Sequence, residues 1–366
     1  MTGLMRRLTR RIAAEGPISV AEYMAECLLS PRDGYYTAGG EPFGAEGDFV
    51  TAPEISQMFG EMIGLWCVDA WQRVLGAPAA FTLVELGPGR GTLMADALRA
   101  ARVVPGFTRA ATLHLVEASP ALRARQAEAL RGHAPAWHDS LDTVPEGPLL
   151  LVANEFFDAL PIRQFVRGDR GIHERRIALD ESGEGLRFVV DARPSPLSPH
   201  LATRLADAPP GTMVEVSPAA ESLVAAIAQR IARHGGAALV VDYGAATPGT
   251  GDTLQAVLRH KSVAVLDHPG AADLTAHVDF AALAEAARNA GIAAHGPVTQ
   301  AALLTGLGIA TRAERLAAAA DAAQRRAITS ALDRLLGEAE MGTLFKALAL
   351  SPQGAAAPAG FAGNME

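Results

Sequence analysis

The sequence predicts an α/β fold in which helices cover both faces of a mostly parallel sheet. Three observations support this prediction. From about residue 80, short apolar runs alternate with helical patterns. A glycine cluster directly follows the first run, and acidic residues end several of the others. Continuous apolar runs are typical of strands buried on both faces, and parallel strands require crossover connections, which are usually helices.

The first 78 residues are expected to form an N-terminal helical region that covers the cleft of the sheet domain. Leu4, Leu8 and Ile12 recur at helical spacing among four arginines. This pattern indicates an amphipathic first helix with a solvated basic face, although a transit peptide has a similar composition.

A second N-terminal helix is predicted to begin at Thr51. Thr51 and Glu54 have the spacing of a capping box, and Pro53 lies in the expected first turn. The stretch from residue 30 to residue 50 is rich in turn-forming residues, which favours a loop or a short hairpin.

The sheet domain is expected to span residues 79–351. Its strand candidates are residues 81–87, 112–119, 148–156 and 237–244, with a last strand within 342–352. Helices are expected after the first two strands and between Asp279, as N-cap, and Gly291, as C-cap. An insertion over about residues 165–220 includes an antiparallel hairpin at 171–190. Residues 352–366 are expected to form a flexible tail.

Composition excludes several classes of protein. The chain has 366 residues and a net charge of −8, without a long basic block, which disfavours nucleic-acid binding. Cys27 and Cys67 form no disulfide framework and no metal-ligand motif, so no metal is expected. No apolar run reaches the roughly 20 residues of a membrane span, and a cytoplasmic location is therefore expected.

The stretch "VELGPGRGTL" (84–93) is the strongest candidate for a binding site. Glu85, Gly87, Pro88, Gly89 and Gly91 form the pattern E-x-G-x-G-x-G. Glycines allow a ligand to approach the backbone closely, and ligands of open α/β sheets bind at the carboxyl ends of strands. The pattern is tighter than G-x-G-x-x-G and lacks the lysine of a phosphate-binding loop.

Acidic residues at the next strand ends indicate a nucleoside. Glu117 ends the second strand, where a carboxylate accepts hydrogen bonds from both ribose hydroxyls. Asp139 follows the expected third strand and is within reach of an adenine amino group. A nucleoside without a pyrophosphate describes S-adenosylmethionine. A dinucleotide is the alternative ligand, and each acid alone also fits a surface residue at a strand end.

The chain resembles the MidA-like class I methyltransferases. The motifs that carry the resemblance are "VELGPGRGTL", "ANEFFDALP", "GDFVTAPEISQMFGE", "GGAALVVDYG" and "DLTAHVDF", in the order of the family. The resemblance extends from residue 18 to residue 348. It implies a Rossmann-like, seven-stranded methyltransferase sheet with a helical N-terminal region and an insertion over the cofactor cleft. The mitochondrial members are protein arginine methyltransferases that act in assembly of respiratory complex I.

The motif "ANEFFDALP" supplies the expected catalytic acids. Glu155 and Asp158 flank two phenylalanines, and carboxylates can bind a guanidinium in a forked geometry and accept its proton. Glu155 is expected to be the main guanidinium partner and Asp158 the second, although either carboxylate could instead cap the following helix. Asn154, expected at the cofactor, departs from the family pattern because mitochondrial members tend to have histidine there.

Further residues are candidates for the substrate wall or for a lid. In the N-terminal region, Pro53 and Gln57 accompany the candidates Asp48, Thr51 and Glu54. Asp242 ends a strand at the edge of the sheet that carries the glycine cluster. Each of these residues also has an ordinary structural interpretation, such as helix capping or packing. The candidates are Asp48, Thr51, Glu54, Tyr243, His277 and Asp279.

The predicted function is methyl transfer from S-adenosylmethionine to an arginine of a protein substrate, with a complex I subunit as the implied partner. Three alternatives remain open at this point. They are a small-molecule O- or N-methyltransferase, an assembly chaperone that binds the cofactor without catalysis, and a nicotinamide dehydrogenase. A homodimer is one of the oligomeric states that the sequence leaves open.

Overall fold

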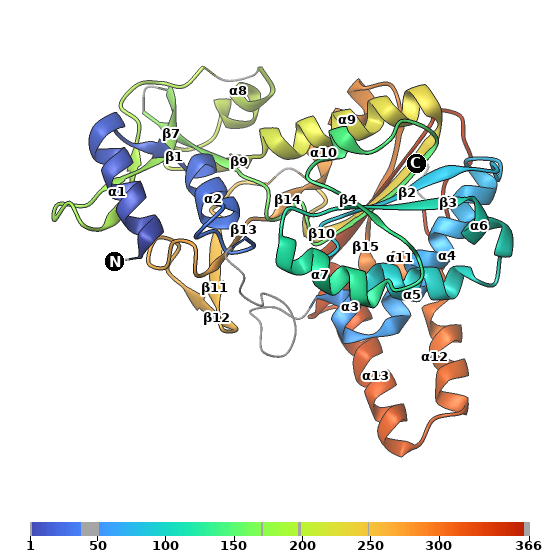
Figure 1. Ribbon diagram of the computed structural model, residues 1–366. Helices are drawn as coiled ribbons and strands as arrows, with labels where there is room; N and C mark the ends of the chain where they lie inside the picture. The colour runs from blue at the N-terminus through green and yellow to red at the C-terminus, as the bar shows by residue number, and fades with distance from the viewer. Residues whose placement is uncertain (1, 38–50, 170, 197–198, 248, 362–366) are drawn as a thin grey trace.

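A computed structural model describes residues 2–37, 51–169, 171–196, 199–247 and 249–361. It contains a large sheet lobe and a smaller lobe that carries the N-terminal helices (Figure 1). Among these residues, no helix combines the length and apolar character needed to cross a membrane.

The large lobe is built on one twisted sheet. Its central strands are parallel, and β16 runs antiparallel to both of its neighbours. A short strand, β14 (Val278–Asp279), adds to the end of β10. In spatial order the other strands are β15 (Ala293–Thr299), β16 (Phe345–Ser351), β10 (Gly236–Ala245), β5 (Leu149–Asn154), β2 (Phe81–Leu86), β3 (Ala111–Val116) and β4 (Ala136–His138). The predicted parallel sheet is confirmed.

Side chains of the central strands alternate between two apolar cores. In β5, Leu150 and Val152 belong to one core, whereas Leu149, Leu151 and Ala153 belong to the other. Helices must therefore cover both faces, which explains the continuous apolar runs. One core includes side chains of α4 (Gln57–Arg73), α5 (Thr92–Ala101), α6 (Pro105–Ala110), α11 (Gln300–Gly306), α12 (Ile309–Ala318) and α13 (Ala322–Leu336). The other includes the turn η1 (Leu141–Thr143), α9 (Pro218–His234) and α10 (Phe280–Asn289).

Two glycines let α4 approach α5 very closely. A Cβ on Gly60 would lie 2.6 Å from the Cβ of Asp96, and a Cβ on Gly64 would lie 2.3 Å from the Ala97 carbonyl oxygen. The two helices are therefore in contact through their backbones. Since α5 begins at the glycine cluster, this contact fixes the helix that starts the predicted binding loop.

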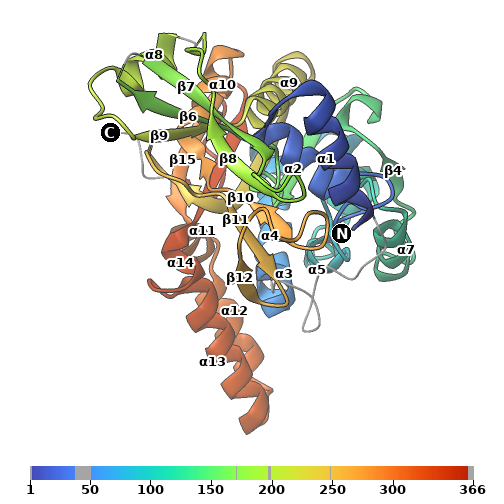
Figure 2. The ribbon, with the colours of Figure 1, turned by 90° about the vertical axis from the view of Figure 1, so that its left-hand side faces the viewer.

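The smaller lobe combines the chain's N-terminus with two insertions. Leu4, Leu8 and Ile12 are buried against it, which confirms the amphipathic first helix. The hairpin expected at 171–190 is present as β7 and β8. Figure 2 shows this lobe facing the viewer. Its elements are α1 (Gly3–Glu15), β1 (Ile18–Ser19), α2 (Val20–Leu29), β6 (Arg163–Gly168), β7 (Gly171–Leu179), β8 (Leu186–Val190), α8 (Pro199–Ala206), β9 (Met213–Val216), β11 (Gln255–Leu258), β12 (Lys261–Val263) and β13 (Asp273–Thr275).

The helix expected from Thr51 is interrupted at Ser56. Residues Ala52–Ile55 form the single turn α3, and Ser56, in extended conformation, caps the start of α4. The capping-box prediction is wrong, because the Thr51 side chain makes no capping hydrogen bond. The first 78 residues also divide between the lobes, since α1 and α2 pack in the smaller lobe and α4 packs on the sheet.

The chain's C-terminal part differs from expectation in two places. The helices α12 and α13 project from the sheet lobe as an antiparallel pair that the sequence analysis did not predict (Figures 1 and 2). A short helix, α14 (Met341–Leu344), leads from them into β16. Within the expected flexible tail, Phe361 is buried in the core beside α4, so residues 352–361 pack on the sheet lobe.

Candidate active site

The glycine cluster forms the tight turn between β2 and α5. Gly87, Gly89 and Gly91 all have positive φ, at 59°, 53° and 83°. This left-handed conformation is easily adopted only by glycine. The Gly87 N–H donates to the Val116 carbonyl oxygen at 3.0 Å, which ties the turn to the end of β3.

Two clefts meet at this turn. A cleft of about 870 Å³ lies on the side of β3, and one of about 410 Å³ lies on the side of α3. Both are lined by Gly87, Gly89 and Glu155. The larger cleft also contains Glu117, Asp139, Phe156, Leu28, Leu29 and Tyr36. The smaller contains Glu85, Pro88, Asn154, Thr51, Glu54 and Arg90.

Glu117 lies at the end of β3 with its carboxylate held by two donors. The Ser119 N–H donates to Oε1 at 2.8 Å, and the Gln126 amide donates to Oε2 at 3.1 Å. Burial raises the pKa of Glu117, although these hydrogen bonds oppose the shift. A carboxylate oxygen accepts more than one hydrogen bond, so each keeps capacity for a ribose hydroxyl.

Asp139 lies at the mouth of the larger cleft. Its carboxylate accepts a hydrogen bond of 2.5 Å from Arg123, whose guanidinium also donates to the Glu117 carbonyl oxygen. Its side chain is largely exposed. Asp139 therefore occupies the edge of the cleft expected to receive an adenine.

The smaller cleft contains two buried acceptor atoms without a hydrogen-bond partner, Oε2 of Glu85 and Oδ1 of Asn154. Burial, with a smaller contribution from the Glu117 charge, raises the pKa of Glu85 to about 8. Buried acceptors without a donor are costly, and they usually mark a place where a ligand or water binds. Their position suits a ligand that carries an ammonium group.

Glu155 lies where the two clefts join and has a positive φ of 50°. Non-glycine residues rarely adopt this conformation, and such strain concentrates at functional sites. Its Oε1 accepts hydrogen bonds from the Ala52 N–H at 2.9 Å and from the Asn154 amide at 3.1 Å. Burial is the main cause that raises the pKa of Glu155 to about 7, and the Asp242 charge adds to it.

Asp242, buried at the end of β10, organises the turn that carries the two predicted catalytic acids. Its Oδ2 accepts the N–H groups of Phe156 at 3.0 Å and Phe157 at 2.8 Å, with a longer contact of 3.4 Å from Asp158. Burial raises its pKa to about 6. The structure thus gives Asp242 a supporting role.

Asp158 lies near three other carboxylates. Burial, followed by the charges of Asp242, Asp273 and Glu155, raises its pKa well above the usual range. Asp273 comes from β13 of the smaller lobe, and the Tyr36 hydroxyl donates to its carboxylate at 3.0 Å. The carboxylates of Asp158 and Asp273 thus lie close together, but neither residue lines either of the two clefts.

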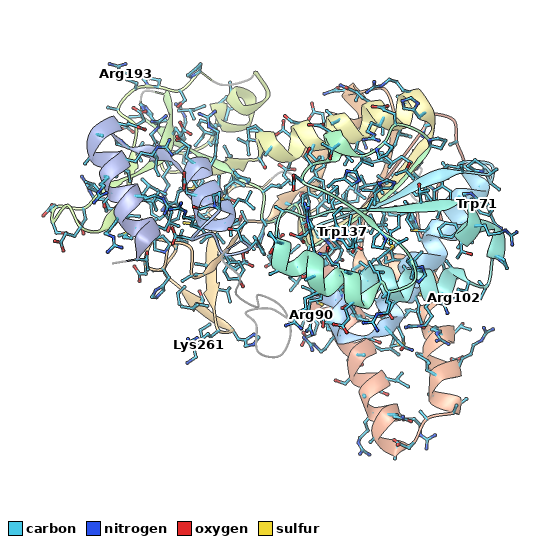
Figure 3. The ribbon with its side chains drawn as sticks, viewed as in Figure 1. Trp71, Arg90, Arg102, Trp137, Arg193 and Lys261 are labelled. Atoms are coloured by element: carbon cyan, nitrogen blue, oxygen red, sulfur yellow. The ribbon has the colours of Figure 1, made fainter. Side chains whose placement is uncertain are left out.

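The turn α3 closes the smaller cleft. Glu54 accepts a hydrogen bond of 2.7 Å from the Thr92 hydroxyl and lies 3.6 Å from Arg90, which Figure 3 labels. Thr51, Pro53 and Glu54 all line the cleft, whereas Gln57 is exposed and lines neither cleft.

Three other candidates lie apart from the glycine loop. The rings of Tyr243 and His277 meet edge to face at 4.3 Å. His277 and Asp279 line a separate hollow of about 580 Å³, and Asp279 caps α10 through the Ala282 N–H. They therefore line neither cleft beside the glycine loop. Asp48 lies outside the described residues.

Several residues that line or support the clefts are not among the candidates from the sequence. Leu28, Leu29 and Tyr36 reach the larger cleft from the N-terminal segment. Gln126 lies inside α7 (Pro120–Ala129), where nothing distinguishes it from a surface glutamine. Its only sequence signal is its place on the helix that follows Glu117.

Comparisons with known proteins agree with this geometry. The profile of a family described as "Putative S-adenosyl-L-methionine-dependent methyltransferase" matches residues 62–298. The chain belongs to this methyltransferase family. Its fold is that of a class I methyltransferase, as predicted, and its cofactor is S-adenosylmethionine.

Similar proteins align with nearly the whole length of this chain. A Burkholderia thailandensis crystal structure bound to S-adenosyl-homocysteine is 32% identical, with a TM-score of 0.84, over 98% of this chain and 94% of that one. The mitochondrial protein arginine methyltransferase NDUFAF7 of Danio rerio is 40% identical over 94% of this chain and 85% of its own length. Its Homo sapiens counterpart is 37% identical over 96% and 84%.

These relatives overturn one prediction. The curated relatives are named as mitochondrial proteins, so the expectation of a cytoplasmic location is wrong. That expectation rested on the absence of a membrane-spanning run, which does not distinguish the two compartments.

The residues of the two clefts fit S-adenosylmethionine. Glu117 and Asp139 would face its adenosine part across the larger cleft. The unpartnered acceptors of Glu85 and Asn154 would suit the ammonium of its methionine part in the smaller cleft. When bound, the cofactor supplies a methyl group on a sulfonium, ready for in-line displacement.

The raised pKa of Glu85 predicts a pH-dependent stability. Because its pKa rises from 4.5 to about 8 on folding, its contribution to the free energy of unfolding is largest below pH 4.5 and falls as the pH rises to about 8. Without cofactor, Glu85→Gln should therefore stabilise the protein at pH 8.5 by on the order of 3 kcal/mol, with a smaller effect at pH 5. Urea unfolding at both pH values measures this difference. A difference independent of pH would contradict the assignment.

Proposed function

We propose that this methyltransferase modifies arginine side chains of a protein. The observation that carries the proposal is a group of neighbouring carboxylates, Glu155, Asp158 and Asp273, of which Glu155 lines both clefts at the glycine loop. Burial, followed by repulsion from the neighbouring carboxylates, raises the pKa of Asp158. A guanidinium relieves such repulsion, whereas a neutral or anionic substrate does not. The names of the relatives in Danio rerio and Homo sapiens support the same substrate.

The proposed chemistry assigns separate roles to the acids. A guanidinium is a poor nucleophile, because its charge is delocalised over three nitrogens and its pKa is above about 12. Glu155, at the junction of the clefts, orients one nitrogen toward the methyl group and accepts the proton that this nitrogen loses. The new bond joins that nitrogen to the methyl carbon, and the bond from this carbon to sulfur breaks. S-adenosylhomocysteine then leaves.

A subunit of respiratory complex I is the proposed protein substrate. The resemblance to the mitochondrial complex I assembly methyltransferases supports this choice. The deciding experiment incubates the purified protein and labelled S-adenosylmethionine with candidate complex I subunits. Mass spectrometry should locate a gain of one or two methyl groups on arginine. Transfer to lysine, to carboxylates or only to small molecules would refute the proposal.

The pKa of Glu155 predicts the pH dependence of catalysis. Only the ionised carboxylate can accept a proton, and its pKa is about 7. The value of kcat/KM should therefore rise by about tenfold per pH unit below pH 7 and level off above about pH 8. Initial rates between pH 5.5 and pH 9 test this. A profile that is flat through pH 7 would exclude Glu155 as the base.

A further inference from the structure

Gln126 connects the two parts of the cofactor site. It lies fully buried on α7. Its Nε2 donates to the Gly89 carbonyl oxygen at 2.8 Å and to Oε2 of Glu117 at 3.1 Å. Its Oε1 accepts a hydrogen bond of 2.9 Å from the indole N–H of Trp137, which is among the residues labelled in Figure 3.

These contacts fix the orientation of the amide. Because the indole N–H of Trp137 can only donate, the side facing it must be the oxygen of Gln126. The amide's two N–H groups then point toward the remaining acceptors, one on Gly89 and one on Glu117. A flipped amide would lose all three hydrogen bonds.

We propose that Gln126 is a positioning residue that holds the glycine loop and the ribose carboxylate at the spacing that S-adenosylmethionine requires. The inference rests on the proposed assignment of Glu117 to the ribose. The side chain of Gln126 thereby links the Gly89 backbone, in the methionine part of the site, to the Glu117 carboxylate, in the adenosine part. Gly89 follows β2, whereas Glu117 follows β3.

The effect on each partner follows from its hydrogen bonds. Gln126 and the Ser119 N–H act on different oxygens of Glu117, so the carboxylate cannot rotate, and each oxygen keeps a lone pair for a ribose hydroxyl. On the loop, the Gly89 carbonyl is drawn toward α7. A Cβ on Gly91 would lie only 3.3 Å from Cα of Gln126, so helix and loop are already in contact.

Calorimetry with S-adenosylhomocysteine on the full chain tests the inference. Gln126→Met keeps the size of the side chain and removes all three hydrogen bonds. It should raise the Kd by about tenfold or more, because a hydrogen bond to a charged acceptor and preorganisation are both lost. The KM for the protein substrate should stay within about twofold, since binding of that substrate uses other residues.

Gln126→Glu is the second variant and covers the case in which the methionine variant does not fold. It keeps an acceptor for Trp137 but removes both donors and adds a negative charge beside Glu117. Its Kd should rise more than that of Gln126→Met. A Kd within about twofold of wild type in the folded variants would overturn the inference.

Gln300→Met is the matched control. Gln300 is also a fully buried helical glutamine, and its amide donates to the Leu335 carbonyl oxygen, away from both clefts. The control should lower the melting temperature and leave the Kd unchanged. An equal rise in Kd in both variants would show a general loss of stability and refute a positioning role.

Glu117→Ala separates the two possible failures. If this variant also binds S-adenosylhomocysteine normally, the assignment of Glu117 to the ribose is wrong. If Glu117→Ala loses affinity while the Gln126 variants keep it, only the inference about Gln126 fails. Arginine methylation by the wild type is measured independently of both.

Discussion

Glu155→Gln is expected to lower the rate of methyl transfer by about 100-fold or more and to leave cofactor affinity nearly unchanged. Glutamine can still accept the Ala52 N–H, so the fold of the site should persist. It cannot accept a proton, and it removes one negative charge from the guanidinium site. Single-turnover transfer to an arginine peptide, with calorimetry of S-adenosylhomocysteine, measures the two quantities separately.

The control for this change is Glu174→Gln. Glu174 is a buried carboxylate of the smaller lobe, paired with Arg163 and Arg176. Its replacement should reduce stability and leave transfer per folded molecule unaltered. Full activity of Glu155→Gln would exclude Glu155 from the reaction, and an equal loss in the two variants would trace the effect to stability.

Gly87→Val is expected to abolish cofactor binding. Position 87 has a φ of 59°, and its Cβ would lie 2.6 Å from Cδ2 of Phe156. A β-branched residue is strained in this conformation, and the added atoms would push Phe156 or the loop into the space between the clefts. Calorimetry should detect no binding of S-adenosylhomocysteine at concentrations that saturate the wild type.

Gly76→Val controls for the backbone strain alone. Gly76 has a φ of 73°, and no atom lies within 4 Å of its added Cβ. Both variants therefore incur a similar conformational penalty, but only one meets a neighbour in the site. Normal cofactor affinity in Gly87→Val would show that the loop does not form the binding surface.

The architecture of the sheet lobe followed from local patterns. Strands buried on both faces require continuous apolar residues, and β2, β3, β5 and β10 lie where such runs predicted them. The break at Ser56 was not predictable in the same way. The apolar pattern continues through Ser56. Tertiary contacts separate α3 from α4, because the Ala52 N–H donates to Glu155 and the Glu54 carboxylate accepts a hydrogen bond from Thr92.

Residues of the candidate site were predictable from the sequence only where the expected ligand contact is made by the backbone or by a side chain at the end of a strand. The glycines and Glu117 stand at such positions. Gln126 and Tyr36 do not, since Gln126 gains its role from Gly89, 37 residues away, and Tyr36 from Asp273, 237 residues away. Asp242 was recognised as a strand-end residue, but its binding to three successive N–H groups depends on how β5 and β10 pair.

The backbone contact between α4 and α5 has a consequence for how this protein can evolve. At Gly64 the neighbouring helix leaves no room for even a methyl group. A larger side chain there would displace the whole of α5, and the glycine loop at its N-terminus would move with it. A substitution at Gly64, more than 20 positions before the loop, is thus constrained through the ligand-binding loop as well as through packing.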